Sequence, residues 1–408
     1  IVIPAPLSRA HDPGERFMLT TLQAGDYLGT FVFAITGGLI SQAWTIEIVI
    51  VLRFLQGMGG SMVMASSLAI LVSVFPAEER GRALGIAVAS VYAGISCGPF
   101  VGGWLVSTLG WRWLFYICVP LGLATFLITC YKLRGEWREA AGEPFDWPGS
   151  LIYAVSILLL ISGAANLDQG LWAWGLIVAA NIGLALFAWY ESHTPYPVLN
   201  MTLLRENRVF ALSSLAALFN YAATFGVTFF LSLYLQYVQG MSPRLAGSML
   251  IIQPIVQTVF SPLCGRLADR YPPGLVASIG MALCAAGLAI AATLGAASGL
   301  ATVVLLLVCL GLGFALFSSP NTSVIMGSVA PRDLGLASGM TGTMRTLGMM
   351  SSMTIITLVF SVYMAGQAVT VETQPAFLLS MRTSLLIFCG LCLVGIACSV
   401  ARQKQTSR

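Results

Sequence analysis

The sequence predicts an all-α protein that crosses a membrane many times, and three observations lead to this fold class. Charged residues make up 9% of the 408 residues and hydrophobic residues 57%, whereas a soluble domain carries about 25% charged residues. Residues 271–331 contain no charged side chain and no histidine, which leaves room for two helices of about 20 residues each. The basic residues gather in alternate connections between the apolar runs.

Apolar runs between charges and turn residues predict twelve membrane-spanning helices. In chain order these are residues 25–43, 46–74, 82–107, 112–131, 147–166, 171–190, 209–236, 244–264, 274–296, 299–324, 335–364 and 382–401.

The Lys and Arg residues test this arrangement and predict its orientation. Fifteen of them lie in one set of alternate connections and the C-terminal tail, whereas the opposite set contains only Arg112, Arg244 and Arg382. Because connections rich in Lys and Arg stay in the cytoplasm, we expect the C-terminus to be cytoplasmic.

Cysteine and histidine usage gives no sign of a metal site or of a disulfide framework. All nine cysteines fall in apolar runs, and the two histidines, His11 and His193, lie outside them. The cysteines therefore read as small hydrophobic core residues, and we expect no metal and no cofactor. The sequence has no HExxH motif and no Walker loop, which argues against a membrane enzyme.

A glycine-rich segment, GIAVASVYAGISCGPFVGG, occupies residues 85–103. Glycines four residues apart lie on one face of a helix, where a second helix can approach to backbone contact, and a proline bends the helix. An ordinary crossing of membrane helices would explain a single such pair. The motif positions are Gly85, Gly94, Gly98, Pro99, Gly102 and Gly103. This pattern resembles the fifth-span signature of drug:proton antiporters in the major facilitator superfamily.

Other segments strengthen the resemblance by their order and spacing. Residues 52–60, LRFLQGMGG, resemble the fourth-span motif of these transporters, and residues 110–120 resemble the start of the sixth span. Segments 145–147, 233–243 and 339–348 resemble parts of the fourteen-span branch.

The resemblance covers residues 25–401 and implies the major facilitator fold, with two helical bundles and an extra helix pair between them. Only two complete spans precede the glycine-rich helix, so we expect the family's first span and most of its second to be missing. The expected domains are an incomplete N-terminal bundle (1–131), a linker region with the two extra helices (132–207) and a C-terminal six-helix bundle (208–408).

Two arginines are predicted inside spans, Arg53 seven residues and Arg345 ten residues from a span end. A charge at such depth costs about 3 kcal/mol and normally faces a cavity or a partner. The resemblance implies that Arg53, with Gln56 of the same motif, assists proton transfer by lowering the pKa of a nearby acid. Arg345 is a second candidate, and snorkelling to the interface is the alternative for both.

The sixteen carboxylates offer no deeply placed partner for these arginines. Asp26 and Glu47 come closest, and both are predicted near helix ends.

Polar residues inside the apolar spans of the C-terminal half are candidates for lining a substrate cavity. Interhelical hydrogen bonds explain such residues equally well. A serine-proline-asparagine sequence, residues 319–321, is predicted to interrupt its helix, as at many transporter binding sites. The cavity candidates are Asn220, Tyr221, Gln253, Gln257, Ser319 and Asn321.

A cytoplasmic connection in the C-terminal half, GRLADR, resembles the gate loop of the superfamily. Its candidate residues are Gly265, Arg266, Asp269 and Arg270. The charges are expected to form a latch beside helix ends, and a solvated surface turn is the alternative.

The function predicted from these features is proton-coupled export of lipophilic drugs or toxic metabolites, by rocking of two bundles around a midplane site. The resemblance implies a monomer in the plasma (inner) membrane, whose partners are the lipid bilayer, protons and a small lipophilic substrate, without nucleic acid. The alternatives are an uncoupled facilitator for a small solute and a truncated remnant that does not transport.

Overall fold

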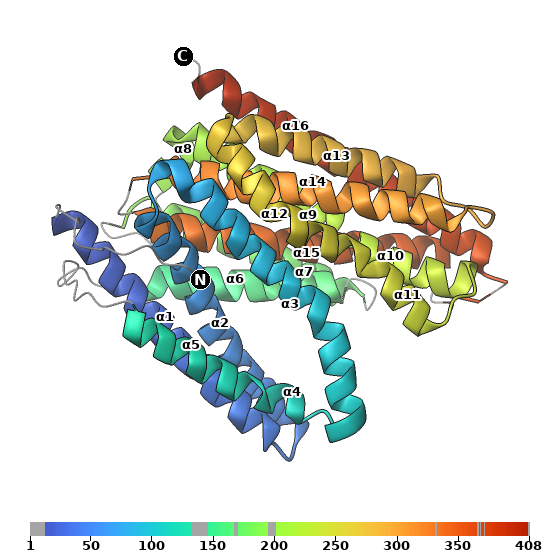
Figure 1. The fold of residues 1–408 in the computed structure, drawn as a ribbon, viewed down its shortest axis with the longest axis horizontal. Helices are drawn as coiled ribbons and strands as arrows, with labels where there is room; N and C mark the ends of the chain where they lie inside the picture. Colours follow the sequence, from blue (N-terminus) through green and yellow to red (C-terminus); the bar gives the residue numbers. More distant parts are fainter. Residues whose placement is uncertain are drawn as a thin grey trace. The chain divides into compact units, whose positions relative to one another are not determined.

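The computed structural model describes residues 13–132, 146–166, 170–194, 201–330, 333–364, 367, 369–370 and 372–406. In this part of the chain all regular secondary structure is helical (Figure 1). In chain order the helices are α1 (Pro13–Ser41), α2 (Ile46–Val74), η1 (Ala77–Glu79), α3 (Arg80–Leu109), α4 (Trp113–Tyr116), α5 (Cys118–Lys132), α6 (Trp147–Ala165), α7 (Leu171–Glu191), α8 (Met201–Glu206), α9 (Arg208–Thr224), α10 (Val227–Leu233), η3 (Tyr234–Val238), α11 (Pro243–Leu250), α12 (Ile252–Arg270), α13 (Pro273–Ala292), α14 (Leu300–Gly327), α15 (Leu334–Met364) and α16 (Gln374–Thr406).

The helices confirm the predicted fold class, because each of the twelve predicted spans overlaps a helix. Nine helical stretches of the described residues are long and apolar enough to cross a bilayer, and residues 147–163 form a shorter apolar helix. The protein is therefore a multi-pass membrane protein.

Polar residues at the helix starts show why the chain becomes helical at those positions. The side chains of Asp146, Asn207 and Ser242 accept hydrogen bonds from the backbone N–H groups three residues later, at the starts of α6, α9 and α11. These bonds satisfy donors that the first turn of a helix leaves unpaired.

The start of α1 corrects one prediction. This helix begins at Pro13 rather than near residue 25, so Asp26 lies thirteen residues from its start and fifteen from its end at Ser41. The prediction that Asp26 lies near a helix end is therefore wrong. Glu47 is the second residue of α2, as expected.

The course of α14 corrects a second prediction. Pro320 lies inside this helix, which continues to Gly327 without the predicted interruption at residues 319–321. Apolar surroundings offer no alternative partner for a freed backbone group, so a helix with one missing N–H bond remains the best arrangement there.

The chain divides into two compact units, and each is described by itself. Unit 1 comprises residues 1–77, 97–143 and 329–342. Within it, α1 packs against α2, α4 and α5. Glycines bring α1 and α2 into backbone contact, because a Cβ built on Gly59 would lie 2.7 Å from the Gly29 carbonyl oxygen. The Arg112 guanidinium closes one end by donating to the Ala43 carbonyl, 3.1 Å away.

Unit 2 comprises residues 78–96, 144–328 and 343–408. Helix α13 packs against α14 and α16, which can be followed in Figure 1, and α9 packs against α14 and α16. Helices α6 and α7 form a hairpin of their own. A Cβ on Gly280 would lie 2.6 Å from the Gly313 carbonyl oxygen, so α13 and α14 cross at glycines, as α1 and α2 do in unit 1.

Alanine at Gly59 should destabilise unit 1, because its Cβ would also meet the Phe33 backbone nitrogen at 2.9 Å. We expect a loss of about 1–3 kcal/mol, as for other overpacked sites. Gly57→Ala is the matched control on the same helix, since a Cβ there meets no heavy atom within 4 Å. Thermal unfolding of the two variants in detergent measures the difference, and equal unfolding temperatures would contradict the crossing.

Candidate functional site

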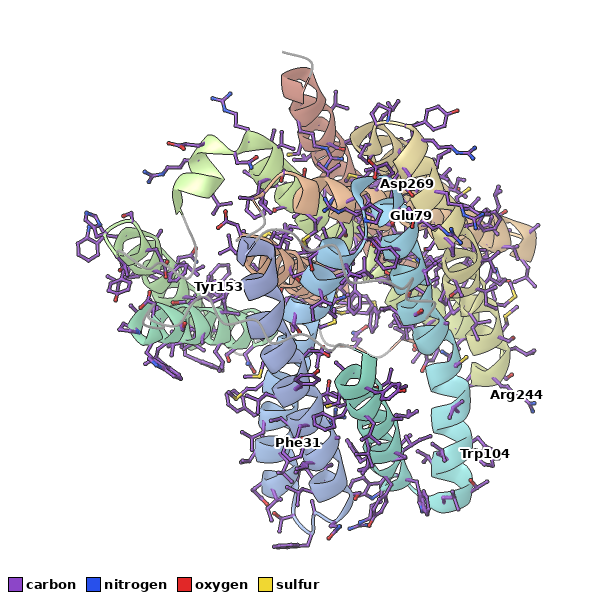
Figure 2. All side chains as sticks on the ribbon, turned by 60° about the vertical axis from the view of Figure 1, so that its left-hand side comes forward. Phe31, Glu79, Trp104, Tyr153, Arg244 and Asp269 are labelled. Carbon is purple, nitrogen blue, oxygen red and sulfur yellow. The ribbon has the colours of Figure 1, made fainter. Side chains whose placement is uncertain are left out.

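The carboxylate of Asp269 holds the start of α3 within unit 2. One carboxylate oxygen accepts a hydrogen bond from the Gly81 N–H at 2.7 Å, and the other accepts from the Arg82 N–H at 2.9 Å. Asp269 is the second-last residue of α12 and can be found beside Glu79 in Figure 2. We call this arrangement, Asp269 with Gly81 and Arg82, the α3 clamp.

The electrostatics of the α3 clamp favour a carboxylate over a neutral group. The first turn of a helix presents unpaired N–H groups and a partial positive charge, so an anion is stabilised there. Hydrogen bonds to an ionised acceptor are also about twice as strong as neutral ones.

Glycines make this contact sterically possible. A Cβ on Gly81 would lie 2.5 Å from the carbonyl oxygen of Gly265, and one on Gly265 would lie 3.2 Å from the Arg82 Cα. The two backbones therefore touch one turn before Asp269. From α14, the buried hydroxyl of Ser319 donates to the Gly81 carbonyl at 3.1 Å.

The predicted gate-loop residues thus have different environments. Asp269 and Gly265 form the contact with α3, whereas Arg266 and Arg270 are exposed. Ser319, predicted to line a cavity, instead bonds the same turn of α3.

Among the glycines of the glycine-rich helix, those at its start make the closest contacts that the described residues show. A Cβ on Gly85 would lie 2.5 Å from the Ser261 carbonyl oxygen and 3.1 Å from the Pro262 Cα. At Gly94 and Gly98 a Cβ would meet no heavy atom within 4 Å in the described part of the chain. The predicted tight crossing at these two positions has no counterpart within their own units.

Of the remaining positions of the glycine motif, the structure describes the surroundings of Gly102 only. Gly102 has ordinary contact with Leu114 at 3.5 Å. The surroundings of Pro99 and Gly103 lie outside the described residues.

A second site surrounds Arg345 in unit 2. One turn further along α15, Gly348 touches α9, since its Cβ would lie 2.6 Å from the Leu218 carbonyl oxygen and 2.8 Å from the Tyr221 Cβ. This crossing brings the Arg345 guanidinium within electrostatic range of the hydroxyls of Tyr92 and Tyr221.

Aromatic rings complete this second site. The Phe314 ring lies edge-on to Tyr92 and Tyr221, with ring centroids 5.5 and 5.3 Å apart. The Tyr221 hydroxyl is hydrogen-bonded to Ser318. We call Arg345, Tyr92, Tyr221, Phe314 and Ser318 the arginine–aromatic cluster. It combines a fixed positive charge with flat apolar surfaces, an arrangement suited to aromatic compounds.

Asn220 and Gln257, two further cavity candidates, are buried in unit 2. Asn220 is fully enclosed, and its amide lies beside the thiol of Cys284. Gln253 is half-buried, and its carbonyl oxygen lies close to Gly311 where α12 meets α14.

Asn321 takes part in a network that the sequence did not predict. Its amide donates to the Ser213 carbonyl at 3.1 Å and accepts from Arg402, whose guanidinium also donates to the Ser213 hydroxyl at 2.8 Å. Arg402 is only 1% exposed, although it follows the last predicted span, residues 382–401. Helix α16 continues to Thr406, past the predicted end of this span at residue 401, and so includes Arg402.

Arg53 occupies an exposed position on α2 in unit 1. Its guanidinium donates to the Gln56 side chain at 3.2 Å and lies 4.8 Å from the centre of the Phe115 ring. Gln56 itself is buried. The predicted partnership between Arg53 and an acid has no counterpart among these contacts.

The described residues contain no group of three or more His, Cys, Asp or Glu side chains able to hold a metal ion. The nine cysteines are free in the structure.

A family profile and several transporters of known sequence match this chain over most of its length. The sequence profile of the Major Facilitator Superfamily matches residues 27–353 and, in a second alignment, residues 213–405. The riboflavin transporter RibZ of Clostridioides difficile is 28% identical over 93% of this chain and 83% of its own length. The uncharacterized transporter YebQ of Escherichia coli is 31% identical over 82% of this chain and 73% of its own length. The tetracenomycin C resistance and export protein of Streptomyces glaucescens is 31% identical over 86% of this chain and 66% of its own length.

Solved structures with the same fold include the transporter FucP in its outward conformation, with a TM-score of 0.61 at 13% identity, covering 94% of this chain and 85% of that one. The human organic anion transporter MFSD10 gives a TM-score of 0.62 at 12% identity, covering 95% and 82%. At such identities the likeness concerns the fold alone.

Removing the Asp269 carboxylate should loosen the start of α3. Each hydrogen bond to a charged group contributes about 1.5–3 kcal/mol, so Asp269→Ala should speed amide hydrogen exchange at Gly81 and Arg82 by about tenfold or more. Glu372→Ala, at an exposed carboxylate, is the control. Exchange measured by mass spectrometry that is unchanged in Asp269→Ala would show that the carboxylate does not hold this helix.

Leucine substitutions along α3 should separate its packed start from its open middle. Gly85→Leu should prevent α3 from packing on α12 and lower the yield of folded protein severalfold. Gly98→Leu on the same helix should fold normally. Size-exclusion chromatography of both variants measures this, and equal losses would contradict the contacts of Gly85.

Proposed function

Because the chain belongs to the Major Facilitator Superfamily, we propose that it is a proton-coupled exporter of lipophilic compounds. As a multi-pass transporter of this superfamily, it contacts the lipid bilayer directly. We further propose that it lies in the plasma (inner) membrane with its C-terminus in the cytoplasm. In each cycle it would exchange inward-moving protons for outward-moving substrate. The fourteen-span antiporter branch remains the proposed subgroup.

The arginine–aromatic cluster is the observation that carries this proposal. The guanidinium of Arg345 is half-buried inside a bilayer-length helix. A charge in such a place costs free energy and is normally retained because it has a function. Here it lies within electrostatic range of the Tyr92 and Tyr221 hydroxyls. The rings of these tyrosines pack edge-on against Phe314, and the three rings offer stacking surfaces to a lipophilic substrate. Arg53 and Gln56 of unit 1 are proposed to act with Arg345 in coupling.

The names of the relatives support an adaptable substrate site of the kind that lipophilic compounds need. One is named for resistance to and export of tetracenomycin C, others for multidrug resistance, and another for riboflavin transport. These names describe compounds of very different shape, as expected if adaptable apolar contacts decide what is carried.

The α3 clamp is proposed to act as the cytoplasmic latch. Its two hydrogen bonds join a carboxylate to N–H groups at a helix start, and water can replace them when the latch opens. A contact made only of apolar side chains would have no such substitute.

An uncoupled facilitator is the second candidate, and one observation favours it. Among the longer helices of the described residues, Asp26 of α1 is the only carboxylate near a helix centre, so few groups are able to carry a proton across. Transport in reconstituted vesicles separates the two functions. An exporter accumulates ethidium against its gradient when a pH gradient is imposed, whereas a facilitator only equalises the concentrations.

Neutralising Arg345 should impair this accumulation. We expect Arg345→Gln to lower proton-driven ethidium uptake into inverted vesicles by about tenfold, and Arg345→Lys to restore part of it, because a positive charge remains. Arg382→Gln, at an exposed arginine of α16, is the matched control and should behave as the unaltered chain. Full activity in Arg345→Gln would remove the cluster from the mechanism.

A further inference from the structure

The carboxylate of Asp26 lies in the middle of α1, where α1 and α2 are held closest. The backbone contact between Gly29 and Gly59 lies about one turn away along α1. This crossing brings the Asp26 side chain to Ser66 of α2, whose residue is only 2% exposed. Asp26 is half-buried. A carboxylate in such a place needs a reason, because ionisable side chains inside spanning helices are costly and normally functional.

The hydroxyl of Ser66 has a single proton to donate and three acceptors within reach, one of which is the Val63 carbonyl oxygen of its own helix at 3.3 Å. Its oxygen lies 2.8 Å from the Met62 carbonyl oxygen of its own helix and 3.4 Å from a carboxylate oxygen of Asp26. When Asp26 is ionised, the Ser66 hydroxyl can turn towards the carboxylate and donate to it. When Asp26 is protonated, the hydroxyl can donate to Met62, and the new carboxyl O–H can donate to the Ser66 oxygen. Both protonation states therefore find a hydrogen bond with little movement.

The other groups around Asp26 leave its charge uncompensated within the described residues. On its own helix, the Tyr27 hydroxyl donates to the Thr129 carbonyl of α5 at 3.4 Å. The Cys130 thiol of α5 is the other titratable group near this tyrosine. From α2, the nearest charged side chain is Arg53, thirteen residues before Ser66 and thus about 20 Å away along the helix.

We propose that Asp26 is a proton-binding site of unit 1 and that Ser66 is its positioning residue. The inference rests on the proposed proton coupling and names the group that carries the proton. In each cycle a proton from water on one side forms an O–H bond on the Asp26 carboxylate. The same bond breaks when the proton leaves to water on the other side, so the residue returns to its starting state.

Vesicles containing the whole chain and a fluorescent pH dye test this inference. Protons moved per ethidium should fall at least tenfold in Asp26→Asn, while ethidium exchange at equal concentrations, without a pH gradient, should stay within about twofold. Glu47→Gln, at the exposed start of the neighbouring helix, should match the unaltered chain in both. Unaltered proton movement in Asp26→Asn would overturn the role of Asp26 and leave the proposed export intact. Net ethidium uptake by the unaltered chain without any proton movement would overturn the coupling itself.

Infrared difference spectroscopy tests the site without relying on transport. A step from mildly alkaline to mildly acidic medium should produce a carboxyl C=O band that Asp26→Asn lacks. Ser66→Ala should shift the frequency of this band, because the carboxyl loses its hydroxyl partner, and Ser66→Thr should restore it. If Asp26→Asn removes no band, Asp26 does not bind the proton. If Ser66→Ala leaves the band unshifted, Ser66 does not position it.

Discussion

The lack of hydrogen-bond partners in hydrocarbon is the constraint on which this structure depends. A polar group in a spanning helix must find its partner within the protein, and a partner on another helix must come close enough to be reached. In this protein the necessary closeness comes from glycine. The contact between Gly29 and Gly59 lies beside Asp26 and Ser66, and the contact of Gly348 with α9 lies beside Arg345.

The α3 clamp follows the same rule at the end of a helix. Gly81 and Gly265 touch through their backbones, and the Asp269 carboxylate bonds the N–H groups of the same turn. Conversely, Gly94 and Gly98 have no close neighbour in the described part of the chain. A glycine in a membrane helix thus marks a position where a second helix can come into contact. At the contacts of Gly29 and Gly265, a polar side chain about one turn away bonds to the partner helix.

Much of the fold could be predicted from the sequence, since apolar runs between charges must become helices in a bilayer. Breaks within these runs could not be predicted, for example the separation of α4 from α5 and the π-helical turn η3 after α10. Such breaks depend on which neighbour offers a bond to a freed carbonyl. The same is true of Pro320, where the helix continues.

The sequence predicts which polar residues lie inside the spans, but it does not predict their hydrogen-bond partners. Ser319 and Asn321 were both expected to face one cavity, yet one bonds α3 and the other bonds Arg402. Residues two positions apart on a helix point about 160° away from each other, so a shared local sequence gives them different neighbours. Arg345 could be predicted because its charge lies deep within an apolar run, but its two tyrosines come from helices that only the tertiary structure brings together.

The two charged centres inside the helices are suited to different tasks, since only one of them can change its charge. An arginine keeps its proton under all conditions that a protein meets, so Arg345 provides a constant field towards Tyr92 and Tyr221. Asp26 can gain and lose a proton, and Ser66 offers a hydrogen bond to either state. A coupled transporter needs both kinds of group, a fixed charge that sets what binds and a variable charge that carries the driving ion. The coupling candidates predicted from the sequence, Arg53, Gln56 and Arg345, include no carboxylate, whereas the proton-binding group that we propose is Asp26.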